Sequence, residues 1–175
     1  MAGSVAIAAR SNEEALRILE KGKSEGIDIV KLMITGGVLD AKEKGVPGEL
    51  KMPPEMVKAV CEKAHEEGYK VAAHVESAEG VKVALENGVD SIEHGAKPTD
   101  EIIDLFKKHH AFLCTTISPA LPYALFDRSI SNASETEQYN GHIVFDGIVE
   151  CAKAAIENGI PIVLGNDVGC PWITQ

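Results

Sequence analysis

Hydrophobic and polar positions along the chain follow a repeated unit. Each unit is an amphipathic helical stretch, then a small or turn-forming residue, then a short apolar run that ends in a polar residue. The apolar runs lie near 27–33, 70–75, 90–93, 111–117 and 160–165. Since these runs are rich in Val and Ile and too short to form helices, they predict buried strands.

Helix-end signals support this division of the chain. Ser11 with Glu14 three residues later forms a capping-box pattern, and Pro53 and Pro54 suit the first turn of a second helix. Glycines stand where a helix C-cap requires a positive φ, at Gly26, Gly68, Gly88 and Gly159. The unit that leads to 111–117 has no glycine at this place.

The order of the elements predicts the fold class. Strands that are apolar on both faces favour a parallel sheet covered by helices, and helix–strand alternation favours right-handed βαβ units. The two long aperiodic segments, 36–52 and 118–138, both follow strands. Such long loops are usually functional, and in α/β barrels the elaborated loops lie at the C-terminal ends of the strands. We therefore expect an α/β fold of about five parallel βα units with its functional face at that end.

Composition excludes several classes of protein. The net charge of −10 argues against binding of nucleic acid, which needs a surplus of Lys and Arg. No apolar run reaches the roughly 18 residues of a membrane span, and the N-terminal residues do not have the pattern of a signal peptide. The cysteines form no C-x-x-C pair and are interpreted as reduced thiols of a cytoplasmic protein, not as structural zinc ligands: Cys61, Cys114, Cys151 and Cys170.

Polar residues end the predicted strands, at Lys31, His74, His94, Thr116 and Asp167. The carboxyl ends of parallel strands meet at the edge of the sheet where ligands bind. If the sheet curls, these side chains converge. Two histidines in equivalent registers favour metal binding, because imidazole is a common zinc ligand.

Each of these residues also has a structural interpretation. A lone histidine at a strand end is more often structural, and Asp167 lies in GNDVG, an ordinary turn sequence. Lys31 could form an ion pair with Glu76 or Glu93, since an unpaired ammonium at the end of a buried strand is costly. The other histidines are expected on helices or at helix ends: His65, His109, His110 and His142.

Four sequence tags, KLMITGG, AAHVES, SIEHG and GNDVG, occur in this order. As an ordered set they resemble the amidohydrolase superfamily, in particular its imidazolonepropionase-like and prolidase-like peptide hydrolases. The resemblance extends from the helix before Lys31 to Asp167. It implies a partial TIM-type (β/α)₈ barrel whose strands correspond to strands four to eight, with the strand that ends at Thr116 as the seventh.

The resemblance also implies a metal centre. Lys31 would be carbamylated and bridge two divalent metals, His74 and His94 would bind the second metal, and Asp167 would bind the first and shuttle protons. A hydroxide shared by two metals is a nucleophile near neutral pH, which suits hydrolysis of amide (C–N) bonds. Zinc is the default ion for this ligand set, although manganese, iron or cobalt fit it as well.

The implied substrates are small peptides or cyclic amides. Ser118 and Tyr123, in the segment after the fourth predicted strand, are candidates for binding a substrate carboxylate. Surface or packing roles are the alternative for both residues.

The chain departs from the family pattern in two respects. It contains no His-x-His pair, which the first strand of the family supplies, and its 175 residues are fewer than the roughly 250 of a complete barrel. We therefore expect residues 1–175 to form one partial barrel domain without strands one to three and the last helix. Its open sheet edges favour self-association or a homo-oligomer, and the chain alone is expected to be inactive or nearly so.

Two other interpretations remain. A nucleotide-binding α/β domain is disfavoured because no strand is followed by G-x-G-x-x-G or a Walker loop. A non-catalytic binding or scaffold domain, with purely structural polar groups at its strand ends, predicts no bound metal. Sensitivity of the melting temperature to a chelator separates this last interpretation from the hydrolase.

Overall fold

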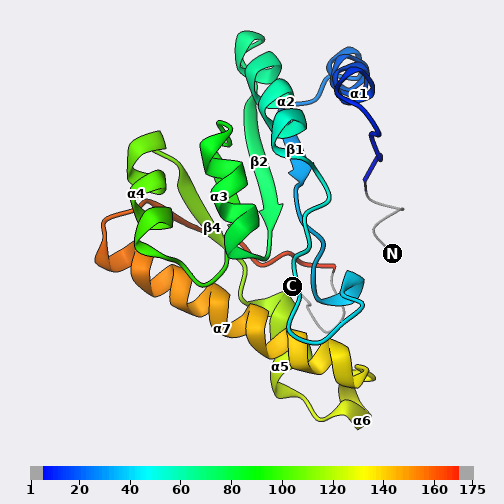
Figure 1. Cartoon of the computed structure of the whole chain (residues 1–175), viewed down its shortest axis with the longest axis vertical. Coiled ribbons are helices and arrows are strands. Elements are labelled where there is room, and N and C mark those ends of the chain that lie inside the picture. Colours follow the sequence, from blue (N-terminus) through cyan, green and yellow to red (C-terminus); the bar gives the residue numbers. More distant parts are fainter. Residues whose placement is uncertain (1–5, 170–175) are drawn as a thin grey trace.

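The computed structural model describes residues 6–169, and its centre is a five-stranded parallel sheet. The strands are β1 (Ile29–Met33), β2 (Lys70–Val75), β3 (Ser91–His94), β4 (Phe112–Thr115) and β5 (Ile162–Leu164). They pair in chain order, β1-β2-β3-β4-β5, and every pair is parallel (Figure 1). Consecutive order is that of neighbouring strands in a (β/α)₈ wall, so the predicted α/β class with a partial TIM-type barrel is confirmed.

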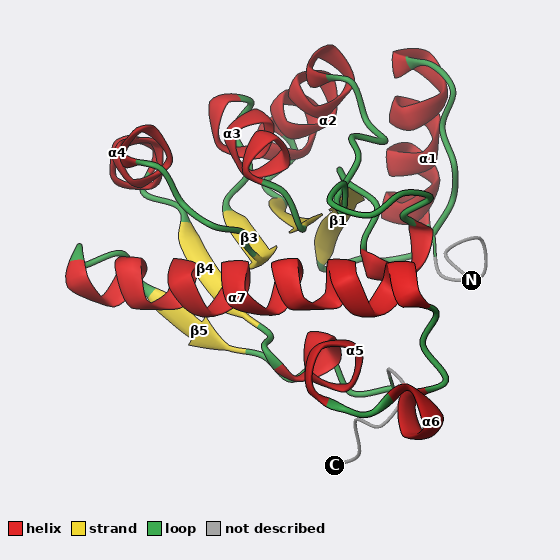
Figure 2. Ribbon diagram, turned by 60° about the horizontal axis from the view of Figure 1, so that its bottom comes forward, coloured by secondary structure: helices red, strands yellow, loops and turns green. Residues whose placement is uncertain are grey.

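Helices connect the strands and cover the sheet. The longer ones are α1 (Asn12–Ser24), α2 (Pro54–Glu66), α3 (Ala78–Glu86), α4 (Asp100–His109) and α7 (Glu135–Glu157). Figure 2 shows α1 to α4 side by side along the sheet. Helix α7 packs against β4 and β5 and also against the short helices α5 (Leu121–Leu125), η2 (Val38–Asp40) and η3 (Ser118–Ala120). The loops after β1 and β4 are thereby held against the same helix.

The two faces of the sheet differ in burial. Side chains on the helix-covered face form the core: Val30, Leu32, Val71, Ala73, Val75, Ile92 and Leu113. On the opposite face the register places Met33 beside His74, His74 beside Glu93, and Glu93 beside Cys114. This opposite face is open over the described residues, since Ile29 and Val163 are about half exposed. A closed barrel would bury it.

The predicted helix ends are largely confirmed. Gly26, Gly68, Gly88 and Gly159 all have positive φ, and His110, at φ 52°, takes this place in the unit that lacks glycine. Ser11 accepts a hydrogen bond from the Glu14 amide, as the capping box predicts. The second hydrogen bond of a capping box, from the Ser11 amide to the Glu14 carboxylate, is replaced. The Glu14 carboxylate accepts from the amide of Arg10 instead.

The prediction of an aperiodic loop over 118–138 is wrong in part. The segment contains η3, α5 and α6 (Arg128–Ser131), and α7 begins already at Glu135. A complete capping box between Ser134 and Glu137 starts α7. The buried amide of Asn140 then joins α7 to the loop after β1, where it donates to the Glu43 carbonyl and accepts from the Gly45 amide, each at 2.8 Å.

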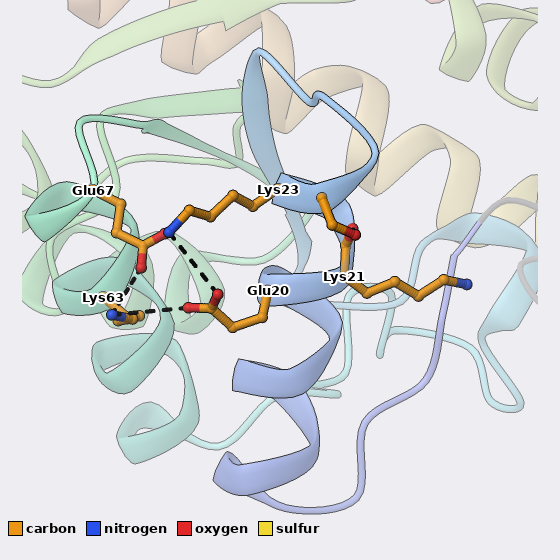
Figure 3. A network of polar contacts seen from close by, with 6 residues as sticks. Glu20, Lys21, Lys23, Lys63 and Glu67 are labelled. Atoms are coloured by element: carbon orange, nitrogen blue, oxygen red, sulfur yellow. Dashed lines mark hydrogen bonds and ion pairs between the residues drawn. The ribbon is translucent and has the colours of Figure 1, made fainter.

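An ion-pair network joins α1 to α2 (Figure 3). The Glu67 carboxylate forms ion pairs with Lys23 Nζ at 2.9 Å and with Lys63 Nζ at 2.8 Å. Both lysines also form longer ion pairs with Glu20. Pairs of this kind at the surface usually contribute little to stability. The network orients α1 on α2, whereas the core supplies most of the stability.

The cysteines that the structure describes are free thiols. Cys61 and Cys151 are buried and Cys114 is partly buried, while Cys170 lies outside the described residues. Within residues 6–169, no helix is both long enough and apolar enough to span a membrane.

Candidate metal centre

Two histidines meet at the C-terminal end of the sheet. His74 is the fifth residue of β2 and His94 is the last residue of β3. Their ring centroids are 4.6 Å apart in an edge-to-face arrangement. His94 has φ 68° and Gly95 has φ 88°, so the chain turns sharply where β3 ends. A Cβ on Gly95 would lie 3.0 Å from Cys151 Sγ, and glycine therefore lets the turn sit directly on α7.

Each imidazole uses one ring nitrogen within the protein. Nδ1 of His94 pairs with Oγ1 of Thr116, the polar residue that follows β4. Both residues are buried, with exposed fractions of 7% for His94 and 4% for Thr116. His74 has a hydrogen bond with the backbone of Gly36. Metal-binding histidines are commonly oriented in this way through the nitrogen that does not face the ion.

Glu76 is the third group of this cluster. The amide of Val38 donates to its Oε2 at 3.1 Å, and its own amide donates to Thr35 Oγ1 at 3.0 Å. One ligand atom from each of His74, Glu76 and His94 lies within 4.8 Å of the others. The sequence indicates Glu76 only as a possible partner of Lys31, and its place directly after β2, two residues beyond His74, is the one local signal for a role in this cluster.

Electrostatics keep both imidazoles in the neutral form. Burial, with a further contribution from the charge of Lys31, lowers the pKa of His74. Burial, followed by His74 and Lys31, holds the pKa of His94 well below its ordinary value. Burial also raises the pKa of Glu76 to about 7, against the opposing effect of the Val38 hydrogen bond. Neutral imidazole is the form that binds metal ions.

Lys31 lies in the middle of β1 and not at its end, which corrects the expectation from the sequence. Its Nζ is 4.0 Å from Glu93 Oε2, and 44% of its side chain is exposed. The structural interpretation, an ion pair with Glu93, is thus present in the fold. Burial lowers the pKa of the Lys31 amine, while Glu93 and Asp167 act in the opposite direction.

Asp167 lies three residues beyond the end of β5 and is exposed. It has φ 50°, and the neighbouring Asn166 side chain accepts from the Val168 amide at 3.1 Å, so GNDVG does form a turn. The charge of Asp167 nevertheless acts on Lys31, His74 and Glu76. The fold therefore brings the rings of His74 and His94 into contact, while Lys31 and Asp167 act on this pair through their charges.

The predicted substrate residues lie in the short helices after β4. Ser118 is the first residue of η3 and Tyr123 lies within α5. Tyr123 is partly buried and packs on a small cluster that includes Val38, Val144 and Ile148. The packing interpretation of Tyr123 is thus present in the fold, and substrate binding by either residue stays a prediction.

The donor set fits a divalent cation. Two imidazoles and a carboxylate are a common set for zinc, and other first-row metals accept it as well. Each of the three side chains has one atom held by the protein, which is the outer-shell support that metal sites require.

No protein-family model matches the chain. A candidate prolidase from Bifidobacterium longum has a similar structure, with a TM-score of 0.87 and 34% sequence identity over 97% of this chain and 42% of that protein. A Xaa-Pro dipeptidase, solved with methionine in its active site, has a TM-score of 0.78 and 27% identity over 94% of this chain and 40% of its own.

Ochratoxinase of Aspergillus niger is 27% identical over 156 residues, which are 89% of this chain and 32% of that enzyme. Its crystal structure matches with a TM-score of 0.77. The chain thus spans about a third of the length of the curated relatives it matches.

Proposed function

We propose that this chain, which is related in sequence and fold to amidohydrolases such as prolidase and ochratoxinase, forms the metal-binding end of a hydrolase that cleaves amide bonds. The observation that carries the proposal is the meeting of His74 and His94 at 4.6 Å, both oriented by the protein and both kept neutral. The similar prolidase and dipeptidase structures match the fold over 97% and 94% of this chain.

The proposed roles follow from the position of each side chain. His74 and His94 would hold one divalent ion, with zinc as the default, and Lys31 and Asp167 would extend the site toward a second ion. Such ions supply a nucleophile from water at neutral pH and polarise the amide carbonyl. The Asp167 carboxylate, beside the centre, is suited to accept a proton from the attacking water and to deliver it to the leaving amine.

Lys31 is suited to carbamylation. In this reaction the neutral amine attacks carbon dioxide, a C–N bond forms, and the nitrogen loses one proton to give an anionic carbamate. Burial lowers the pKa of Lys31 and so increases the fraction of neutral amine. The product would replace a cation by an oxygen ligand able to bridge two metals.

We propose small peptides or cyclic amides as substrates. The names of the similar enzymes point to this class, since one of them is a Xaa-Pro dipeptidase. Ser118 and Tyr123 are proposed to contact a substrate carboxylate from the loop after β4. The open edges at β1 and β5 are proposed to support self-association, and the family's His-x-His pair would have to come from residues that this sequence does not contain.

Metal content and hydrolysis of the purified chain test the proposal. We expect bound divalent metal that is lost on replacement of both histidines by asparagine, and at most weak hydrolysis of Xaa-Pro dipeptides. A chain that takes up no divalent metal would contradict the proposed site. Turnover equal to that of a complete prolidase would contradict the expected incompleteness.

A non-catalytic scaffold is the second candidate. The Lys31–Glu93 pair at 4.0 Å and the His94–Thr116 hydrogen bond favour it, because both are satisfied without any ion. On this alternative, a chelator leaves the melting temperature of the purified chain unchanged, whereas a metal that binds only the folded chain raises it.

A further inference from the structure

We propose that Glu76 is a metal ligand, and that His74, Glu76 and His94 together form a complete three-ligand site for one divalent cation within this chain. The inference rests on the proposed function because it shares the two histidines with it. It adds an anionic ligand, the unmodified Glu76 carboxylate, so that the ion on the histidines has three ligands before any carbamylation of Lys31. The starting observation is that one ligand atom of each residue lies within 4.8 Å of the others.

Each of the three side chains has a hydrogen bond to a different part of the fold. Thr116, after β4, engages Nδ1 of His94 and leaves Nε2 as its other ring nitrogen. The backbone of Gly36 engages His74, and the Val38 amide engages Oε2 of Glu76. Each ligand therefore keeps one donor atom for an ion while a second atom fixes its orientation, the arrangement seen around metal-binding histidines and carboxylates.

The loop after β1 is shaped around Glu76. A Cβ on Gly37 would lie 2.7 Å from Glu76 Oε2, and a Cβ on Gly48 would lie 2.7 Å from the Glu76 carbonyl oxygen. Gly48 also has φ 75°, a conformation that side chains disfavour. Two glycines thus allow backbone to approach the glutamate on both sides. The approach at Gly37 is the one that brings the Val38 amide to the carboxylate.

The other two candidate ligands differ from Glu76 in their chemistry and exposure. Lys31 requires modification, has 44% of its side chain exposed and is paired with Glu93. Asp167 is exposed and follows β5 by three residues. Glu76, in contrast, is partly buried and follows β2 directly, two residues beyond His74.

The ligand set defines the cation. Two imidazoles and one carboxylate bind zinc, cobalt, iron or manganese and leave further coordination positions open for water or substrate. Oxygen-only ions such as magnesium and calcium are disfavoured, because the imidazoles supply two of the three ligands.

Isothermal titration of the metal-free chain with Co²⁺ tests the assignment. We expect Glu76→Gln, which keeps the size of the side chain, to weaken Co²⁺ binding by between about 10-fold and 100-fold. Asp40→Asn is the matched control: Asp40 is exposed and its charge acts on His74 and Glu76, but it is not a member of the cluster. Its removal should change the affinity by less than about 3-fold, the effect of one screened charge.

The outcomes separate this inference from the proposed function. Co²⁺ binding that is lost in His94→Asn but unchanged in Glu76→Gln would overturn the role of Glu76 and leave the histidine site standing. Equal weakening by Asp40→Asn and Glu76→Gln would assign the effect to charge alone and also overturn it. No Co²⁺ binding by the unmodified chain would contradict both. The Co²⁺ absorption spectrum gives a second readout, since loss of a carboxylate ligand changes the band positions while the two imidazoles remain.

Discussion

His74 and His94 lie on the neighbouring inner strands β2 and β3, and Glu76 directly follows β2. We refer to these three residues as the histidine half of the centre. Lys31 and Asp167, the edge half, come from β1 and from the segment after β5, the two outermost strands. His94 is 7% exposed and paired with a buried threonine, whereas Lys31 has 44% of its side chain exposed.

This difference indicates which ligands of a barrel site a partial barrel can hold in place. Ligands on adjacent inner strands are fixed by the strand register and by the loops packed on them. Ligands on the two edges approach each other only through curvature of the sheet, and an edge strand has one fewer neighbour to hold it. The histidine half should therefore bind metal in this chain, and the edge half should depend on what else packs against the open face.

The largest effect is expected from His94→Asn. Asparagine tolerates the positive φ at this position but removes the imidazole. We expect metal affinity to fall by more than about 100-fold, because loss of an outer-shell partner alone costs about 10- to 100-fold. His142→Asn, at an exposed site on α7, is the control and should bind metal as the unmodified chain does. Equal affinity of both variants would remove the distinction between the two halves.

Gly80→Ala should disturb the histidine half through Thr35, which contacts Glu76. Gly80 lies in the first turn of α3, and an added Cβ would overlap Cγ2 of Thr35, whose Oγ1 accepts the Glu76 amide. We expect a loss of about 2 kcal/mol in the free energy of unfolding, as for other overpacked sites.

Gly22→Ala in α1 is the control for this change. Its Cβ would come no closer than 3.2 Å to the Ile27 side chain, and alanine is the better helix former. Urea titrations of both variants measure the difference. Equal stability of Gly80→Ala and the unmodified chain would show that the contact between α3 and Thr35 is looser than the structure indicates.

The metal-free chain should become more stable when Glu76 is replaced by glutamine. Because burial raises the pKa of Glu76 to about 7 from 4.5, the folded chain holds this proton more tightly than the unfolded chain. Its contribution to stability is complete below pH 4.5 and is lost as pH rises through 7. At pH 8 we expect Glu76→Gln to gain on the order of 1–2 kcal/mol without metal, and bound metal should reverse the order.

The histidines contribute to the pH dependence with the opposite sign. Their pKa values are lowered in the folded chain, so stability falls as pH decreases below 6.5. In Glu76→Gln this histidine effect is no longer offset, and stability should rise with pH between about 5 and 7. Chemical denaturation across this range measures the slope, and a flat profile for the variant would contradict the assignment of neutral, buried imidazoles.

The smallest effect is expected far from the centre, at Glu67 between α1 and α2. Lys63 and Lys23 lower the pKa of Glu67 to about 2, so its contribution is present above pH 4.5 and is lost as pH falls toward 2. Glu67→Gln should lower the melting temperature slightly at low salt, and high salt should remove the difference. Metal affinity should not change. A change in metal affinity would show that the helix layer communicates with the sheet end.

Local patterns in the sequence predict the framework of this fold. The five strands and the C-cap glycines depend on short-range periodicity, and the structure confirms them. The equivalent registers predicted for His74 and His94 are offset by one residue, because His94 pairs with Val75 and His74 with Glu93. The helices within 118–138 were missed, although the capping box of Ser134 and Glu137 could have marked the start of α7.

Tertiary contacts decide the rest. The position of Lys31 along β1 depends on the residue at which β1 begins to pair with β2. A single run of apolar residues does not define that residue. The orientation of the Glu76 carboxylate depends on a hydrogen bond from the Val38 amide. Val38 is 38 residues away in the chain and is brought close by the loop after β1. A site that assembles through such a loop has no local sequence signal apart from two-residue spacing.

Anomalous diffraction from crystals of the chain grown with Zn²⁺ or Co²⁺ tests the central claim most directly. We expect one peak at the metal edge, within bonding distance of His74, Glu76 and His94 and without a bond to Asp167. A peak that contacts Lys31 and Asp167 but not Glu76, or no peak at the strand ends in metal-containing crystals, would contradict the claim that the histidine half is a complete site.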